Sequence, residues 1–183
     1  CQIMKTAFLR FCFILSIIIA PLSMFSKTVY YIKSSATGDG SALSWVNASN
    51  NIQKIIDQAQ AGDEIWIAKG TYFPPERSTY SWSLFLKDGI NIYGGFSGTE
   101  TSLDERVKSD LNKDGTVQPW EYENVVIISG DIERNDDPED LDRFTYLDNC
   151  SRVIETEGKA FINETKLDGI TISGGSAIYS IHL

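Results

Sequence analysis

The clearest candidate for a chemical site is the stretch 110–121, which begins with oxygen-bearing side chains at every second position. Five positions can supply oxygens: Asp110, Asn112, Asp114, Thr116 and Glu121. In a twelve-residue calcium loop, positions one, three and five direct side-chain oxygens at the ion. Position seven adds a backbone carbonyl, and the glutamate at position twelve adds two oxygens. The spacing therefore predicts a calcium site made by these five residues.

The remaining positions of the loop agree with this chemistry. Gly115 stands at position six, where the chain must turn sharply, and Gln118 at position nine can contribute through a water. The pattern is that of an EF-hand loop, so we expect a short entering helix from a capping box at 102–105 and an exiting helix from Pro119. We interpret the ion as structural. The alternative is a cluster of turn-forming residues that binds nothing.

A second group of acids follows without the ordered spacing of a metal loop. Its members are Asp131, Asp136, Asp137, Glu139, Asp140 and Asp142. We interpret this group as a solvated, charged loop, with a second cation site as the alternative.

Composition excludes several function classes. The 183 residues carry a net charge of −9, which argues against a nucleic-acid partner, and an apolar share of 42% is enough for a packed core. There is no zinc-type cluster, phosphate loop or catalytic triad, so no catalytic residue is predicted. The four tryptophans are candidates for sugar-stacking platforms, with Trp66 the best of them. We favour the alternative, in which these aromatic side chains cover the cap and loops.

Residues 1–26 are predicted to be a cleaved signal peptide. Lys5 and Arg10 precede an apolar stretch that Pro21 interrupts, which makes the stretch short for the alternative of a membrane-spanning helix. Cleavage is expected after Ser26 or Ser23. The mature part, 27–183, then has no other span and keeps only Cys150, which is expected to be an inert thiol rather than a nucleophile.

The mature part combines one helix with many short strands. A helix over 51–61 is predicted from apolar residues at helical spacing, with Asn50 or Asn51 as its cap and Gly62 at its end. Short β-branched runs punctuated by glycine predict the strands. They are expected at 29–33, 64–68, 84–86, 90–93, 125–128, 152–155 and 170–173.

The phrase Asp-Gly-Ile-x-Ile-x-Gly-Gly occurs twice, at 88–95 and 168–175. Such repetition predicts a parallel β-solenoid, in which each strand pairs with its equivalent one turn later and the helix caps the end. One interior column is then expected from Ile90, Ile92, Ile170 and Ile172. The alternative is a β-sandwich built from hairpins.

Three stretches resemble known proteins. Residues 52–72 are similar to the opening of right-handed parallel β-helix proteins of the pectin-lyase-like superfamily. Residues 92–102 and 167–175 resemble secreted bacterial β-helix proteins of that group, including those likened to polymorphic outer-membrane proteins.

The resemblance implies a right-handed parallel β-helix on the cell surface or outside the cell, with further turns beyond residue 183, so that the chain is a fragment. We expect a non-catalytic scaffold for adhesion or glycan binding, stabilised by calcium, with a polysaccharide or cell-surface glycan as partner. The alternative is a polysaccharide lyase or glycoside hydrolase whose catalytic turns lie beyond residue 183. A purely structural stalk is a third class.

Overall fold

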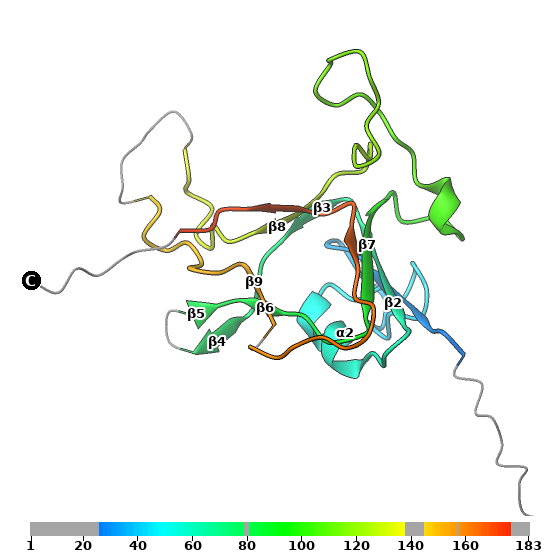
Figure 1. The fold of residues 1–183 in the computed structure, drawn as a ribbon, viewed down its shortest axis with the longest axis horizontal. Helices are drawn as coiled ribbons and strands as arrows, with labels where there is room; N and C mark the ends of the chain where they lie inside the picture. Colours follow the sequence, from blue (N-terminus) through cyan, green and yellow to red (C-terminus); the bar gives the residue numbers. More distant parts are fainter. Residues whose placement is uncertain (1–25, 79–80, 138–144, 157, 177–183) are drawn as a thin grey trace, which may run out of the picture.

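The computed structural model describes residues 26–78, 81–137, 145–156 and 158–176 (Figure 1). These parts of the chain form mostly β-sheet, with parallel strands and little helix, as the all-β prediction requires. The strands are β1 (Val29–Ile32), β2 (Glu64–Ala68), β3 (Gly70–Tyr72), β4 (Glu76–Ser78), β5 (Ser81–Trp82), β6 (Leu84–Phe85), β7 (Asn91–Phe96), β8 (Val126–Ser129), β9 (Ile154–Glu155), β10 (Leu167–Asp168) and β11 (Thr171–Ser173).

The strands form three parallel sheets and one antiparallel pair. The first sheet has the order β1-β2-β7-β10, the second has the order β11-β8-β3, and the third pairs β6 with β9. Strands β4 and β5 are antiparallel. From β6 to β11 the chain visits the third, first and second sheets, and then visits them again in the same order.

Apolar side chains from all three parallel sheets meet in one buried cluster. Strand β2 shows how alternation divides its residues, because Ile65 and Ile67 point into this cluster while Trp66 points to the other face. Trp66 is only 4% exposed and stacks on Phe96, with the ring centroids 4.7 Å apart. Trp66 is therefore a packing residue and not a sugar platform, in agreement with the favoured interpretation, because the chain itself covers its ring.

The predicted helix forms as α2 (Ile52–Gln58) and ends earlier than expected. Asn51 is its cap, and the Asn51 side chain accepts a hydrogen bond from the backbone N–H of Lys54 at 2.9 Å. Gly62 has a φ of +96° and lies in the turn before β2, after the helix has ended. Residues between them leave the helix because Ala59 already has extended backbone angles.

The helix α2 also satisfies the free edge of β6. The Gln53 side chain accepts a bond from the Phe85 N–H at 2.8 Å and donates one to the Phe85 carbonyl at 3.2 Å. A neighbouring strand would make the same two bonds, so the amide protects this edge from pairing with another chain. The role of the helix as the cap of a solenoid stays a prediction.

The two copies of the repeated phrase do not occupy equivalent positions. Ile92 belongs to the first sheet and pairs with Leu167, whereas Ile172 belongs to the second sheet, pairs with Ile128 and is 53% exposed. The predicted single column of Ile90, Ile92, Ile170 and Ile172 is therefore wrong. The reason is that a local phrase encodes a strand but not the sheet that the strand joins.

No helix in the described ranges is long and apolar enough to cross a membrane. The predicted signal peptide over 1–26 lies outside the described residues, apart from Ser26.

Candidate metal centre

The predicted calcium loop projects from the body of the molecule between β7 and β8 (Figure 1). Two backbone bonds close its neck: Ser109 N–H donates to the Glu121 carbonyl at 3.0 Å, and Glu123 N–H donates to the Val107 carbonyl at 2.9 Å. Lys108 and Tyr122 form an antiparallel bridge between them. The first and last positions of the loop, Asp110 and Glu121, therefore lie close together at the neck.

The expected flanking helices are mostly absent. A single 3₁₀ turn over Leu103–Glu105 precedes the loop, and Ser102 makes no capping bond with its side chain. Glu105 instead accepts bonds from the N–H and hydroxyl of Thr101, both at 2.8 Å. After Pro119 the chain enters the neck bridge and not a helix. The helix–loop–helix expectation is wrong because pairing across the neck takes the backbone groups that an exiting helix would need.

The side chain of Tyr122 anchors the neck to the sheets. Tyr122 is 6% exposed, and the Arg106 guanidinium carbon lies 4.4 Å from the centre of its ring. Burial raises the pKa of the Tyr122 hydroxyl. Arg106 also forms an ion pair with Asp168 at 3.1 Å and donates to the Gly94 carbonyl at 3.0 Å. Sequence reasoning missed both anchor residues, because neither belongs to the loop motif.

Glycines of the two repeated phrases make room for this anchor. A β-carbon on Gly95 would lie 2.7 Å from Cγ of Tyr122, and one on Gly169 would lie 2.9 Å from its Cδ2. Gly95 also has a φ of +93°, which other residues rarely adopt. The glycines that punctuate the repeats therefore also hold the loop in place.

Within the loop, backbone N–H groups orient the side-chain oxygens. The two oxygens of Asp110 accept from Asp114 N–H at 3.1 Å and from Gly115 N–H at 2.9 Å. Asn112 Oδ1 accepts from Asp114 N–H at 2.9 Å, and Asp114 Oδ1 accepts from Thr116 N–H at 2.9 Å. Gly115 has a φ of +89°, so the sharp turn predicted at position six is present.

The closing glutamate is buried at the neck. Glu121 is 5% exposed, and its two oxygens accept from Asn112 N–H at 3.3 Å and from Gln118 N–H at 2.7 Å. The loop thus wraps around the Glu121 carboxylate from both sides. A carboxylate oxygen that accepts one bond keeps a further lone pair, which is the capacity a metal ligand needs.

The donor set fits calcium, which prefers oxygen ligands from carboxylates, amides and backbone carbonyls. Within the described ranges, no three His, Cys, Asp or Glu side chains lie close enough to hold a metal ion. Two of the five predicted ligands, Asn112 and Thr116, are of other kinds. Calcium binding at Asp110, Asn112, Asp114, Thr116 and Glu121 stays a prediction.

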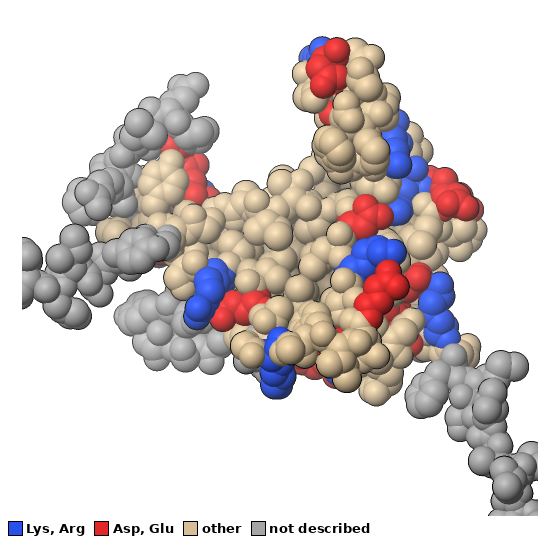
Figure 2. Space-filling model, in the orientation of Figure 1, with Lys and Arg blue, Asp and Glu red and all other residues tan. Residues whose placement is uncertain are grey.

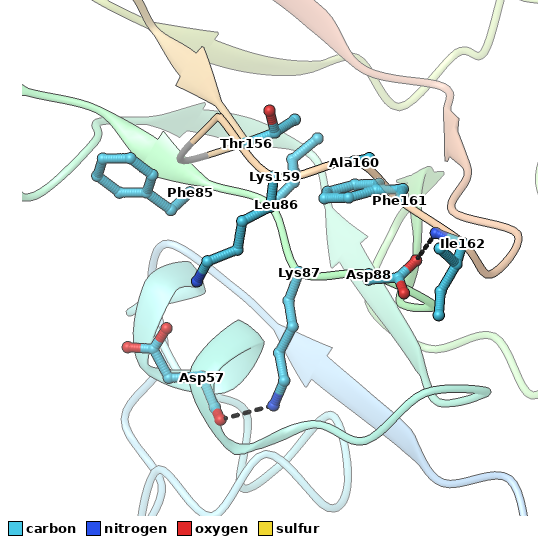
Figure 3. Close-up of a pocket in the computed structure, with 10 residues that line it drawn as sticks. All are labelled: Asp57, Phe85, Leu86, Lys87, Asp88, Thr156, Lys159, Ala160, Phe161 and Ile162. Atoms are coloured by element: carbon cyan, nitrogen blue, oxygen red, sulfur yellow. Dashed lines mark hydrogen bonds between the residues drawn. The ribbon is translucent and has the colours of Figure 1, made fainter.

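Elsewhere, a cavity of about 480 Å³ lies between α2, β6 and the segment after β9 (Figure 3). Its polar groups already serve the fold. Lys87 Nζ donates to the Asp57 carbonyl at the end of the helix at 3.1 Å, and Asp88 accepts from the N–H groups of Ile162 and Asn163. These bonds hold strand connections together.

Two further predictions concern Cys150 and the acidic group. Cys150 is 1% exposed, and burial raises the pKa of its thiol to about 11, as an inert side chain requires. In the acidic group, Asp131, Asp136 and Asp137 are described, while Glu139, Asp140 and Asp142 lie outside the described residues.

Comparisons with models of protein families, with curated proteins and with solved structures found no match for this chain.

Proposed function

We propose that this chain is the N-terminal part of a secreted or surface right-handed parallel β-helix that serves as a calcium-stabilised, non-catalytic scaffold for adhesion or glycan binding. The coiled architecture is supported by the order in which the chain visits the three parallel sheets. Each visit adds a strand beside an earlier one, as β7 does beside β2 and β8 does beside β3. A solenoid grows in this way.

One end of this architecture is closed. Residues 42–49 cover the outer edge of β1: Tyr31 N–H donates to the Ala42 carbonyl at 2.8 Å, and Ser49 N–H donates to the Tyr31 carbonyl at 3.0 Å. Together with the Gln53 contact on β6, these bonds occupy strand backbone groups at this end. A stacked parallel fold needs such a cap to prevent edge-to-edge association.

Glycan binding is supported by one observation, the position of Trp120. Its side chain is 68% exposed at the neck of the calcium loop. Beside it lies a hollow of about 150 Å³, whose lining includes Leu111, Val125, Ile170 and Thr171. An exposed indole next to apolar and hydroxyl groups suits the apolar face of a sugar ring, and a bound ion would hold the indole in place.

The calcium part of the proposal is tested by thermal unfolding of the purified chain with and without calcium. Calcium should raise the melting temperature, and Asp110→Ala combined with Glu121→Ala should reduce that rise. Asp104→Ala is the matched control, because Asp104 is an exposed acid outside the loop. The proposal is contradicted if excess calcium leaves the melting temperature of the wild type unchanged. It is also contradicted if Asp104→Ala, and not the double variant, loses the calcium response.

The glycan part is tested by binding to an array of bacterial and plant polysaccharides. We expect binding that needs calcium and that Trp120→Ala weakens about tenfold or more, since stacking on one aromatic ring contributes about 1–2 kcal/mol. Trp82→Phe is the control, because Trp82 packs against the core. Product formation from any polysaccharide would favour the hydrolase or lyase alternative.

A further inference from the structure

Residues 131–137 and 145–149 form the described parts of a second excursion from the sheets, and a backbone bond closes its neck. The chain leaves β8 at Gly130 and returns at Cys150, whose N–H donates to the Gly130 carbonyl at 2.9 Å. Asp131 and Asn149 therefore flank the neck of this segment, as Asp110 and Glu121 flank the neck of the first.

The Asp131 carboxylate organises the start of the segment. One oxygen accepts from Asn135 N–H at 3.1 Å and the other from Asp136 N–H at 3.3 Å. These bonds fold the chain back, so that Asp136 lies beside Asp131 and reaches the neck from the other side. The Asp136 Oδ2 atom accepts from the Asn149 side-chain amide at 2.8 Å.

Two oxygens at this point are buried without a partner. The Asn149 side chain is 91% buried, since the residue is only 9% exposed, and its Oδ1 atom has no hydrogen bond. The Oδ1 atom of Asp136 is likewise buried and unbonded. Native proteins satisfy nearly all buried polar atoms, so two unbonded acceptors on adjacent side chains point to a ligand that both can bind.

We propose that Asp131, Asp136 and Asn149 bind a second divalent cation, Ca²⁺, independently of the loop at 110–121. The Asn149 amide donates to Asp136 Oδ2 at 2.8 Å and so holds the two side chains together. The unbonded Oδ1 atoms of these two side chains are the ligands that we assign to the ion, at the distance of about 2.3–2.6 Å that Ca²⁺ takes.

The charges around the site favour a cation. Glu133 and Asp148 belong to the same segment, and Asp148 Oδ2 accepts from the Glu133 N–H at 2.9 Å. The described basic side chain of this segment, Arg134, lies over the Phe73 ring with its guanidinium carbon 4.4 Å from the ring centre. Oxygen ligands from two carboxylates and one amide suit Ca²⁺ rather than Zn²⁺, which prefers nitrogen and sulfur.

The test uses the full chain carrying Asp110→Ala and Glu121→Ala, so that the first loop is silent and the two proposals are separated. Calorimetric titration with CaCl₂ should still show one site, and calcium should still raise the melting temperature. Adding Asp136→Asn should remove both signals, while the exposed control Glu133→Gln should keep them. No heat and no thermal shift in the silenced chain would mean that water satisfies these oxygens, and the proposal would be overturned.

Asn149→Asp gives a second test, because its effect on stability depends on whether a cation binds at this neck. If a cation binds, the added carboxylate should tighten calcium binding by about tenfold, because affinity rises with ligand charge. The variant should then be less stable than the wild type in EDTA and recover in calcium. Equal destabilisation with and without calcium would contradict the proposal, since two buried carboxylates would then face each other with no ion between them.

Discussion

Two excursions leave the sheets of this protein. Both are closed at a neck by backbone bonds, but they differ in whether the side-chain oxygens at the neck accept hydrogen bonds. In the loop at 110–121, backbone N–H groups of the loop contact both oxygens of Asp110 and both oxygens of Glu121. At the neck between Asp131 and Asn149, by contrast, two buried oxygens accept no hydrogen bond. Figure 2 shows acidic side chains at the tip of the projecting loop. The comparison teaches that a regular motif can orient its own ligands, whereas an irregular one depends on what binds.

The anchors of the two necks differ as well. The first is held by the Tyr122 ring packed between glycines and under Arg106. The second is held by the bond between Cys150 and Gly130 and by the contact of Asn149 with Asp136. We therefore expect side-chain packing to keep the first neck closed even without an ion. The second neck should depend on a bound ion to stay closed.

The largest expected effect is that of Tyr122→Ala. Removing a ring this deeply buried should cost about 3 kcal/mol, because it leaves a cavity and an unshielded Arg106. Urea unfolding measures the loss, and calcium binding by the first loop should weaken with it. Tyr122→Phe keeps the ring and should cost less than about 1 kcal/mol, since the hydroxyl contact with Asp168 is long, at 3.4 Å. Equal costs for the two variants would show that the ring does not anchor the neck.

The next effect concerns Glu100, whose carboxylate holds the turn at the start of the first excursion. Burial raises its pKa, but hydrogen bonds from the N–H groups of Ser97 and Thr99 outweigh burial and lower the pKa to about 2, from an ordinary 4.5. The depressed value means that the ionised form stabilises the fold above about pH 4.5. That contribution is lost as the pH falls towards 2.

Glu100→Gln should therefore cost about 2–3 kcal/mol at pH 7 and almost nothing at pH 2. Urea unfolding as a function of pH measures this difference. A cost that does not change between pH 7 and pH 2 would show that the charge of Glu100 is not what stabilises the turn.

A smaller effect, in rate rather than in stability, is expected at Cys150. Its thiol is buried and its pKa is raised to about 11, so alkylation at pH 8 should be slow in the folded chain. If an ion holds the second neck, EDTA should accelerate modification of the peptide that contains Cys150, as followed by mass spectrometry. Asp110→Ala with Glu121→Ala should leave the rate unchanged in calcium. Acceleration by that pair alone would show that the first loop controls both necks.

The smallest effect is expected for Asp104→Asn. Asp104 is exposed in the 3₁₀ turn before the first neck, outside the ligand set. Its substitution should change the free energy of unfolding by less than about 0.5 kcal/mol and leave calcium binding intact. A large loss of calcium affinity would mean that long-range charge, rather than the ligand geometry, controls the loop.

Local features were the ones that the sequence predicted well. Asn51 caps the helix, and the short β-branched run at 64–68 forms β2, because both depend on neighbours within a few residues. The turn at Gly115 is of the same kind, since the oxygens of Asp110, Asn112 and Asp114 accept from N–H groups close by in the chain.

The sequence could not predict in this way which sheet a strand joins, or which residues pack over an aromatic side chain. Ile172 belongs to a different sheet from Ile92 although both stand in the same phrase, because pairing depends on the path of the intervening chain. Trp66 is covered by Phe96 and Tyr31, which come from separate segments. Alternation along β2 places Trp66 on the face opposite Ile65 and Ile67, but it does not specify what lies on that face.

The sequence by itself determined the all-β class, the helix and the order of oxygens in the first loop, since periodicity and spacing act over short distances. Only the tertiary structure decided that Tyr122 and Arg106 anchor that loop against Gly95 and Asp168. It likewise brought Asn149 to Asp136 across thirteen positions of the chain. Burial creates the need for a partner at this second neck, and burial is a property of the folded chain rather than of any short stretch of residues.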